Sequence, residues 1–126
     1  MKSLGMQSGQ LPDAQITSYT ETNSAWRAAN GRLYFEKILS GREGAWRAGT
    51  NDVHQWFQVD FGGWAKITRV ATQGRHDANE WIKRYTLSFS YDGVFFEPYK
   101  QNGRTAVGNN TNKIIVNLTK VAELLC

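Results

Sequence analysis

The most regular pattern of hydrophobic and polar positions lies at residues 56–62, Trp-Phe-Gln-Val-Asp-Phe-Gly. Phe57, Val59 and Phe61 alternate with the other residues of this segment, so they share one face of an extended chain. This period of two predicts a strand with one face in a hydrophobic core. Two glycines, Gly62 and Gly63, follow and predict a turn at its end.

A second alternation passes through Tyr85, Leu87 and Phe89 and predicts a strand within residues 81–90. The Asp92-Gly93 pair that follows favours a hairpin turn into residues 95–99. Other β-rich segments lie at residues 15–20, 64–75 and 114–118. Many short strands separated by Gly, Asn and Asp predict an all-β sandwich or barrel.

Composition supports one globular domain. The 126 residues are 40% hydrophobic and 13% aromatic, which is enough to build a core. No apolar run approaches the roughly 20 residues of a membrane span. The net charge is +4 and the basic residues form no run, which favours a mixed solvated surface over a dedicated acidic-ligand surface.

Cysteine usage and the N-terminus bear on the compartment. Cys126 is the only cysteine, so it cannot form an internal disulfide. The first residues contain no apolar stretch long enough for a signal peptide. The chain is therefore either cytosolic or a segment of a larger secreted protein.

The residues give no support to catalysis or to a cofactor. No Gly-x-Ser-x-Gly motif or phosphate-binding loop is present, and Asp60 has no second carboxylate near it in sequence. One cysteine and two distant histidines do not make a zinc site. Asp77, Asn79 and Glu80 offer too few oxygens for calcium unless backbone carbonyls complete the site. The aromatic residues fit alternating core positions better than a nucleic-acid surface, so we expect no catalytic residue, metal, cofactor or nucleic-acid partner.

The order of motifs resembles the discoidin domain family, also called the coagulation factor C-type domain. The resemblance implies a single domain over residues 1–126 with a distorted, galactose-binding-like jelly-roll β-sandwich or barrel. The residues that carry it are Leu4-Gly5-Met6, Gln15-Ile16-Thr17, Trp26 with Arg32-Leu33, Ala45-Trp46, residues 56–62, residues 71–75, residues 85–90 with Asp92-Gly93, and residues 108–111.

The chain departs from the family pattern in two places. The family pairs a first cysteine, before its Leu-Gly-Met element, with a final one, and only the final one is present here as Cys126. The resemblance also implies that a strand and a tryptophan-containing turn are missing after about residue 118. Residues 121–126 resemble the family's terminal Val-Glu-Leu-Leu-Gly-Cys joined on directly.

The resemblance further implies a non-catalytic, extracellular recognition module of a larger protein. Family members meet phospholipids, glycans, collagen or other proteins through three loops at one end, which correspond to residues 19–25, 38–43 and 76–79. The candidate ligand-binding residues are Tyr19, Thr22, Asn23, Ile38, Leu39, Arg42, Arg75, His76, Asp77, Asn79 and Trp81.

The first of these loops separates the ligand classes. Its tip is polar with one acid, whereas insertion into a bilayer needs large apolar side chains. A glycan or protein ligand is therefore favoured. The alternative is an anionic membrane met by Ile38 and Leu39, with Lys37 and Arg42 as a basic collar; these two apolar residues otherwise pack under their own loop.

Several candidates have both a binding and a structural interpretation. Trp81 is either a platform for a sugar or a half-buried structural residue, and Arg75 is either a ligand contact or the partner of a carboxylate. His76 would add pH sensitivity near its ordinary pKa, although exposed loop histidines seldom do. Asn109 begins an Asn-Asn-Thr sequon in a predicted loop and is a glycosylation candidate if the protein is secreted.

Overall fold

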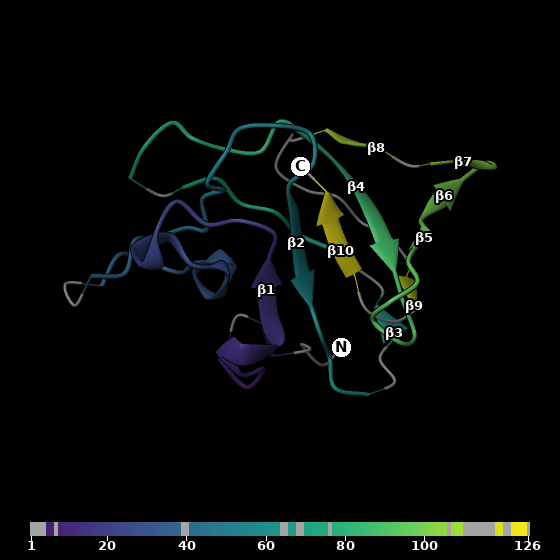
Figure 1. Cartoon of the computed structure of the whole chain (residues 1–126), viewed down its shortest axis with the longest axis horizontal. Helices are drawn as coiled ribbons and strands as arrows, with labels where there is room; N and C mark the ends of the chain where they lie inside the picture. The colour runs from purple at the N-terminus through teal and green to yellow at the C-terminus, as the bar shows by residue number, and fades with distance from the viewer. Residues whose placement is uncertain are drawn as a thin grey trace.

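The fold consists of short strands and 3-10 turns (Figure 1). It is known from a computed structural model that describes residues 5–6, 8–38, 41–63, 66–67, 70–75, 77–105, 107–109, 118–119 and 122–125. Within these residues no helix is long and apolar enough to cross a bilayer. The prediction of an all-β chain is confirmed.

One six-stranded sheet organises the molecule. Its neighbouring strands are antiparallel, and a strand from the C-terminal end of the chain lies at its centre between two strands from the middle of the sequence. The order across the sheet is β1 (Ile16–Ser18), β2 (Trp56–Val59), β10 (Ala122–Leu125), β4 (Arg84–Phe89) and β5 (Glu97–Pro98), with β8 (Val107–Asn109) also paired to β4.

Smaller elements surround this sheet. Two two-stranded sheets pair β3 (Lys66–Ile67) with β9 (Leu118–Thr119), and β6 (Lys100–Gln101) with β7 (Arg104–Thr105). Three 3-10 turns lie in the first third of the chain: η1 (Asp13–Gln15), η2 (Ser24–Trp26) and η3 (Ala28–Gly31).

The predicted alternation determines which side chains form the core. In β2 the side chains of Phe57 and Val59 are buried, and Val59 is paired with Ile16 of β1. These three residues belong to one hydrophobic cluster. A second cluster contains Ile67, Tyr85 and Leu87, and the partly buried ring of Phe61 packs against both clusters. Phe61 therefore joins the two halves of the core.

The predicted hairpin after β4 is also confirmed. Ser88 and Phe89 of β4 pair with β5. The carboxylate of Asp92 accepts the backbone N–H groups of Val94 and Phe95 at 2.9 Å each, and Gly93 adopts a φ of +75°. The turn is thus held by its own hydrogen bonds, which is the usual role of Asp in such a turn.

The predicted strand boundaries were too generous. Among the described members of residues 64–75, Lys66–Ile67 form a strand and Val70 makes an isolated bridge, whereas the backbone N–H of Arg75 bonds to Glu80 within a loop. β4 begins at Arg84, where its pairing with β8 begins, and not at Trp81. Residues 110–117, which cover most of the predicted strand at 114–118, lie outside the described residues.

Arg32 ties the N-terminal segment to the end of η3. Its side chain is only 8% exposed, and it donates hydrogen bonds to the backbone oxygens of Met6 and Leu11 at 2.7 and 2.6 Å. It also donates to Asp13 at 2.7 Å, and Arg42 lies 3.4 Å from the other oxygen of the same carboxylate. A buried guanidinium needs such partners, so this cluster is a structural requirement.

We expect the Asp13 carboxylate to make stability depend on pH. The hydrogen bond from Arg32 lowers the pKa of Asp13, so its contribution is complete above about pH 4 and is lost as pH falls through the lower folded pKa. Because the carboxylate is half exposed, the contribution should be about 0.5–1 kcal/mol. Urea unfolding should show that Asp13→Asn has a lower free energy of unfolding than the wild type at pH 7. Between pH 7 and pH 2 the free energy of unfolding should fall less in Asp13→Asn than in the wild type.

The matched control removes an equal charge from exposed Glu36 as Glu36→Gln. This change should leave the acid dependence as it is in the wild type. An Asp13→Asn protein with the wild-type acid dependence would contradict the assignment.

Candidate ligand-binding site

Three loops, residues 19–25, 38–43 and 76–79, meet at one end of the molecule, which we call the loop end. The backbone N–H of Glu43 donates to the carbonyl oxygen of Ala25 at 2.8 Å, which ties the second loop to the first. The guanidinium of Arg75 lies over the ring of Trp26 at 4.7 Å, which ties the third loop to the residue after the first. Figure 1 places this end opposite β5, β6 and β7.

Local hydrogen bonds determine the shape of the first loop. The side chain of Asn23 accepts the backbone N–H of Ala25 at 2.9 Å and caps η2. The hydroxyl of Thr22 donates to the carbonyl oxygen of Ala48 at 2.9 Å. Tyr19 is 59% exposed, and its ring lies 6.2 Å from that of Trp56. Thr22 and Asn23 therefore build the loop, and their contact with a ligand stays a prediction.

The second loop exposes one of its two predicted apolar residues. Ile38 is 42% exposed and pairs with Arg42 across a tight turn, with its N–H 2.8 Å from the Arg42 carbonyl oxygen. Leu39 lies outside the described residues. Ile38 is therefore presented to solvent and does not pack fully under its own loop.

The side chain of Arg42 is turned toward the body of the protein. Its Nε donates to the side-chain oxygen of Asn30 at 2.9 Å, and its guanidinium lies 4.8 Å from the centre of the Phe35 ring. Lys37, which the sequence places beside it in a basic collar, pairs with Glu43 at 3.0 Å. Both cations are thus engaged within the protein, and their contact with a ligand stays a prediction.

Arg75 organises the third loop. Its Nε donates to Asp77 at 2.5 Å, and a terminal nitrogen donates to Glu80 at 3.0 Å. The hydrogen bond to Asp77 raises the pKa of Arg75, with a smaller contribution from Glu80. The structural interpretation of Arg75, as the partner of a carboxylate, is therefore observed. His76 lies outside the described residues, and Asn79 is exposed.

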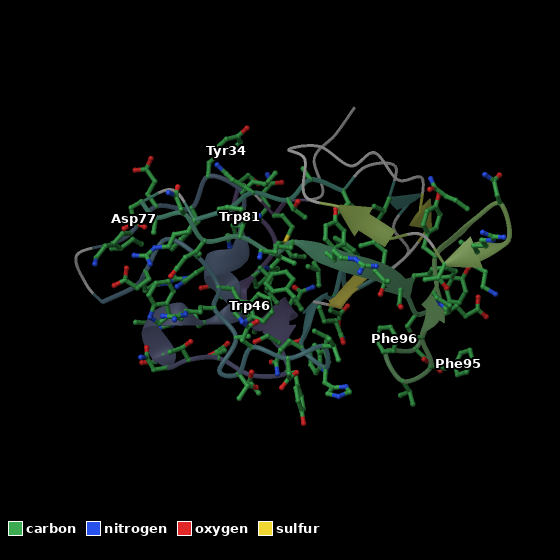
Figure 2. All side chains as sticks on the ribbon, turned by 90° about the horizontal axis from the view of Figure 1, so that it is seen from above. Tyr34, Trp46, Asp77, Trp81, Phe95 and Phe96 are labelled. Carbon is green, nitrogen blue, oxygen red and sulfur yellow. The ribbon has the colours of Figure 1, made fainter. Side chains whose placement is uncertain are left out.

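An exposed aromatic patch, Tyr34 and Trp81, lies beside this loop. Tyr34 is 69% and Trp81 is 55% exposed, so about half of the Trp81 residue is open to solvent and both of its interpretations stay open. The N–H of Tyr34 donates to the side chain of Gln73 at 2.8 Å, and a Cβ at Gly74 would lie 3.2 Å from that of Trp81. Both aromatic residues therefore flank residues 73–74. Figure 2 shows them in the same half of the molecule as Asp77, with Phe95 in the other half.

Sequence reasoning missed Tyr34. It adopts a φ of +58°, a left-handed conformation that is uncommon for a residue with a side chain. The available signal was the run Leu33-Tyr34-Phe35, because three consecutive large apolar residues cannot all face one core. The middle residue of this run is the one exposed.

Two other expectations concern metals and modification. Within the described residues no group of three His, Cys, Asp or Glu side chains could hold a metal ion. Asp77 and Glu80 both pair with Arg75, which offsets the negative charge that would attract calcium. Asn109 was expected in a loop, but it lies in β8 opposite Arg84; its glycosylation stays a prediction.

Comparison with known proteins gives consistent matches. The F5/8 type C domain family matches residues 15–122. Human coagulation factor VIII is 37% identical over 109 residues, 82% of this chain and 4% of that protein. Bovine coagulation factor V is 34% identical over 105 residues, 78% of this chain and 4% of that protein. Rat lactadherin is 33% identical over 123 residues, 87% of this chain and 28% of that protein.

Solved structures agree at the level of the fold. Discoidin II of Dictyostelium discoideum has a TM-score of 0.62 at 20% identity, over 87% of this chain and 47% of that chain. CpGH89CBM32-5 of Clostridium perfringens, solved in complex with GalNAc-β-1,3-galactose, has a TM-score of 0.62 at 18% identity, over 92% and 86% of the two chains. The chain spans less than a third of each curated relative named above.

We expect Arg75→Gln to loosen the loop end. The change removes two ion pairs and the contact with the Trp26 ring, and it should lower the free energy of unfolding by about 1–2 kcal/mol. Hydrogen exchange of the amide of Arg75, which bonds to Glu80, should accelerate. Asp77→Asn keeps the Glu80 pair and the ring contact, so its effect should be smaller. Equal effects of the two changes would contradict this view of Arg75.

Proposed function

Because this chain belongs to the F5/8 type C domain family, we propose that it is a non-catalytic, extracellular module that recognises a glycan or protein ligand through its loop end. Family membership also bears out the resemblance in the sequence and the discoidin-like jelly-roll fold. Of the two ligand classes, the described surface favours a glycan.

The observation that carries this choice is the exposed ring of Trp81 beside the Arg75 ion-pair cluster. The apolar face of a sugar ring packs on an aromatic side chain, and its hydroxyl groups need donors and acceptors at the edge of that ring. Asp77 and Glu80 leave 34% and 48% of their side chains exposed for this purpose. A flat apolar surface next to fixed polar groups is suited to a sugar.

The relatives support an extracellular role. The chain covers only a small part of coagulation factor VIII and of lactadherin, so their whole activities do not transfer to it. The Clostridium perfringens module of similar fold was solved with a disaccharide, which supplies a first neutral probe. We propose that this chain acts as one recognition unit of a longer secreted protein.

We expect Trp81→Ala to weaken glycan binding about tenfold or more, because the sugar loses the ring on which it packs. Tyr34→Ala should weaken it as well. The measurement is binding of the purified chain to a glycan microarray, followed by calorimetric titration of the best neutral probe, with GalNAc-β-1,3-galactose included.

The matched control is Phe95→Ala, because Phe95 is 69% exposed, as Tyr34 is, and lies in the other half of the molecule (Figure 2). It should leave binding unchanged. Binding that survives Trp81→Ala but is lost in Phe95→Ala would refute the site. Failure of the wild type to bind any glycan would refute the glycan assignment.

The second candidate function is peripheral binding to anionic membranes, and the exposure of Ile38 is the observation that favours it. An exposed apolar side chain at a tight turn can enter the interface of a bilayer. In vesicle sedimentation with phosphatidylserine, Ile38→Asp should then abolish binding. Val94→Asp, at the hairpin after β4, is the control and should have no effect, although Val94 is more exposed than Ile38. Vesicle binding that Ile38→Asp leaves unchanged would exclude this candidate.

A further inference from the structure

The one acid of the first loop, Glu21, is exposed but forms hydrogen bonds within the protein. A carboxylate oxygen of Glu21 accepts the backbone N–H of Ala28 at 2.7 Å and the hydroxyl of Ser18 at 3.4 Å. Its negative charge is thus used to hold η3 against β1. Both donors are neutral groups, so they position the Glu21 carboxylate without offsetting its charge.

Two arginines beside this loop, Arg27 and Arg47, are exposed and form no ion pair with a carboxylate among the described residues, although Arg27 attracts Asp13 over a longer distance. Arg27 donates from Nε to the backbone oxygen of Ser24 at 3.0 Å, which leaves its terminal nitrogens available. The guanidinium of Arg47 lies 5.5 Å from the centre of the Trp26 ring. The N–H of Arg47 donates to the Trp26 carbonyl oxygen at 3.3 Å, so both arginines come from backbone adjacent to Trp26.

Trp26 places these charges next to the proposed sugar site. Its ring also contacts Arg75 at 4.7 Å, but the charge of Arg75 is offset by Asp77 and Glu80. The Trp26 ring therefore contacts the guanidinium groups of both Arg47 and Arg75. That of Arg75 is paired with carboxylates, whereas that of Arg47 forms no ion pair among the described residues. The backbone of Arg75 also bonds to Glu80, the residue before Trp81.

We propose that the ligand is an acidic oligosaccharide, in which one sugar packs on the aromatic patch and a carboxylate or sulfate group binds Arg27 and Arg47. This inference rests on the proposed glycan-binding function and names the ligand class. Guanidinium groups suit such an acid, because their planar arrangement of donors matches two of its oxygens. The ring of Trp26 holds Arg47 in place, so less side-chain freedom is lost on binding.

The test uses matched glycans that differ only in the acidic group. A microarray that carries each core in neutral, sulfated and sialylated form should show binding to the acidic forms, and calorimetry should give about tenfold tighter binding for them. Arg47→Gln and Arg27→Gln should each remove most of this difference and leave the neutral core unchanged. Added salt should weaken binding of the acidic forms alone.

The matched control is Arg104→Gln, which removes the same charge from exposed Arg104 of β7, away from the loop end. It should leave the preference for acidic glycans intact. Arg47→Lys keeps the charge but loses the planar donors, so it should restore the salt dependence and only part of the affinity.

Each other outcome overturns the inference. Equal binding of neutral and acidic forms that is lost in Trp81→Ala leaves the proposed function standing and refutes the acidic class. Binding to phosphatidylserine vesicles that depends on Arg47, with none to acidic glycans, assigns the anion to a lipid instead. Absence of binding to every glycan refutes both the inference and the glycan assignment.

Discussion

The contact between Arg75 and the ring of Trp26 holds the loop end together. The two residues are far apart in sequence, and their contact fixes the third loop against the segment that follows the first. Arg75 can play this part because Asp77 and Glu80 offset its charge and position its guanidinium. Trp81 follows Glu80 directly in the chain. The ion pairs of Arg75 with Asp77 and Glu80 therefore also position the backbone that carries the exposed ring of Trp81. The proposed site depends on this interaction more than on any strand.

The sheet was predictable because burial follows the alternation of residues. Phe57 and Val59 of β2 are buried as their spacing requires, and the Asp92-Gly93 turn forms where the sequence places it. The alternation cannot predict which strands become neighbours. β10 lies between β2 and β4 because of pairings between distant residues, and no local pattern contains that information. Ser88 and Ser90 show the same limit, since both are buried at positions that looked polar.

The candidate site was predictable as a set of loops but not as a surface. The family resemblance located all three loops, and Arg75, Asp77 and Trp81 were named from sequence. What the sequence could not supply is the partner of each side chain. Whether a loop residue such as Asn23 faces a ligand or caps its own turn depends on a hydrogen bond that local sequence leaves open.

Charge is the property for which this limit matters most. A net charge of +4 describes the chain as mildly basic, yet its arginines fall into two physical classes. Arg32 and Arg42 both form ion pairs with Asp13 and stabilise the fold, so their charge is largely offset within the protein. Arg47 forms no ion pair with a carboxylate among the described residues, and Arg27 interacts with Asp13 only through a longer-range charge attraction that helps to lower the pKa of Asp13. Because an unpaired surface cation retains its full attraction for an anion, recognition depends on how charges are paired and not on their number.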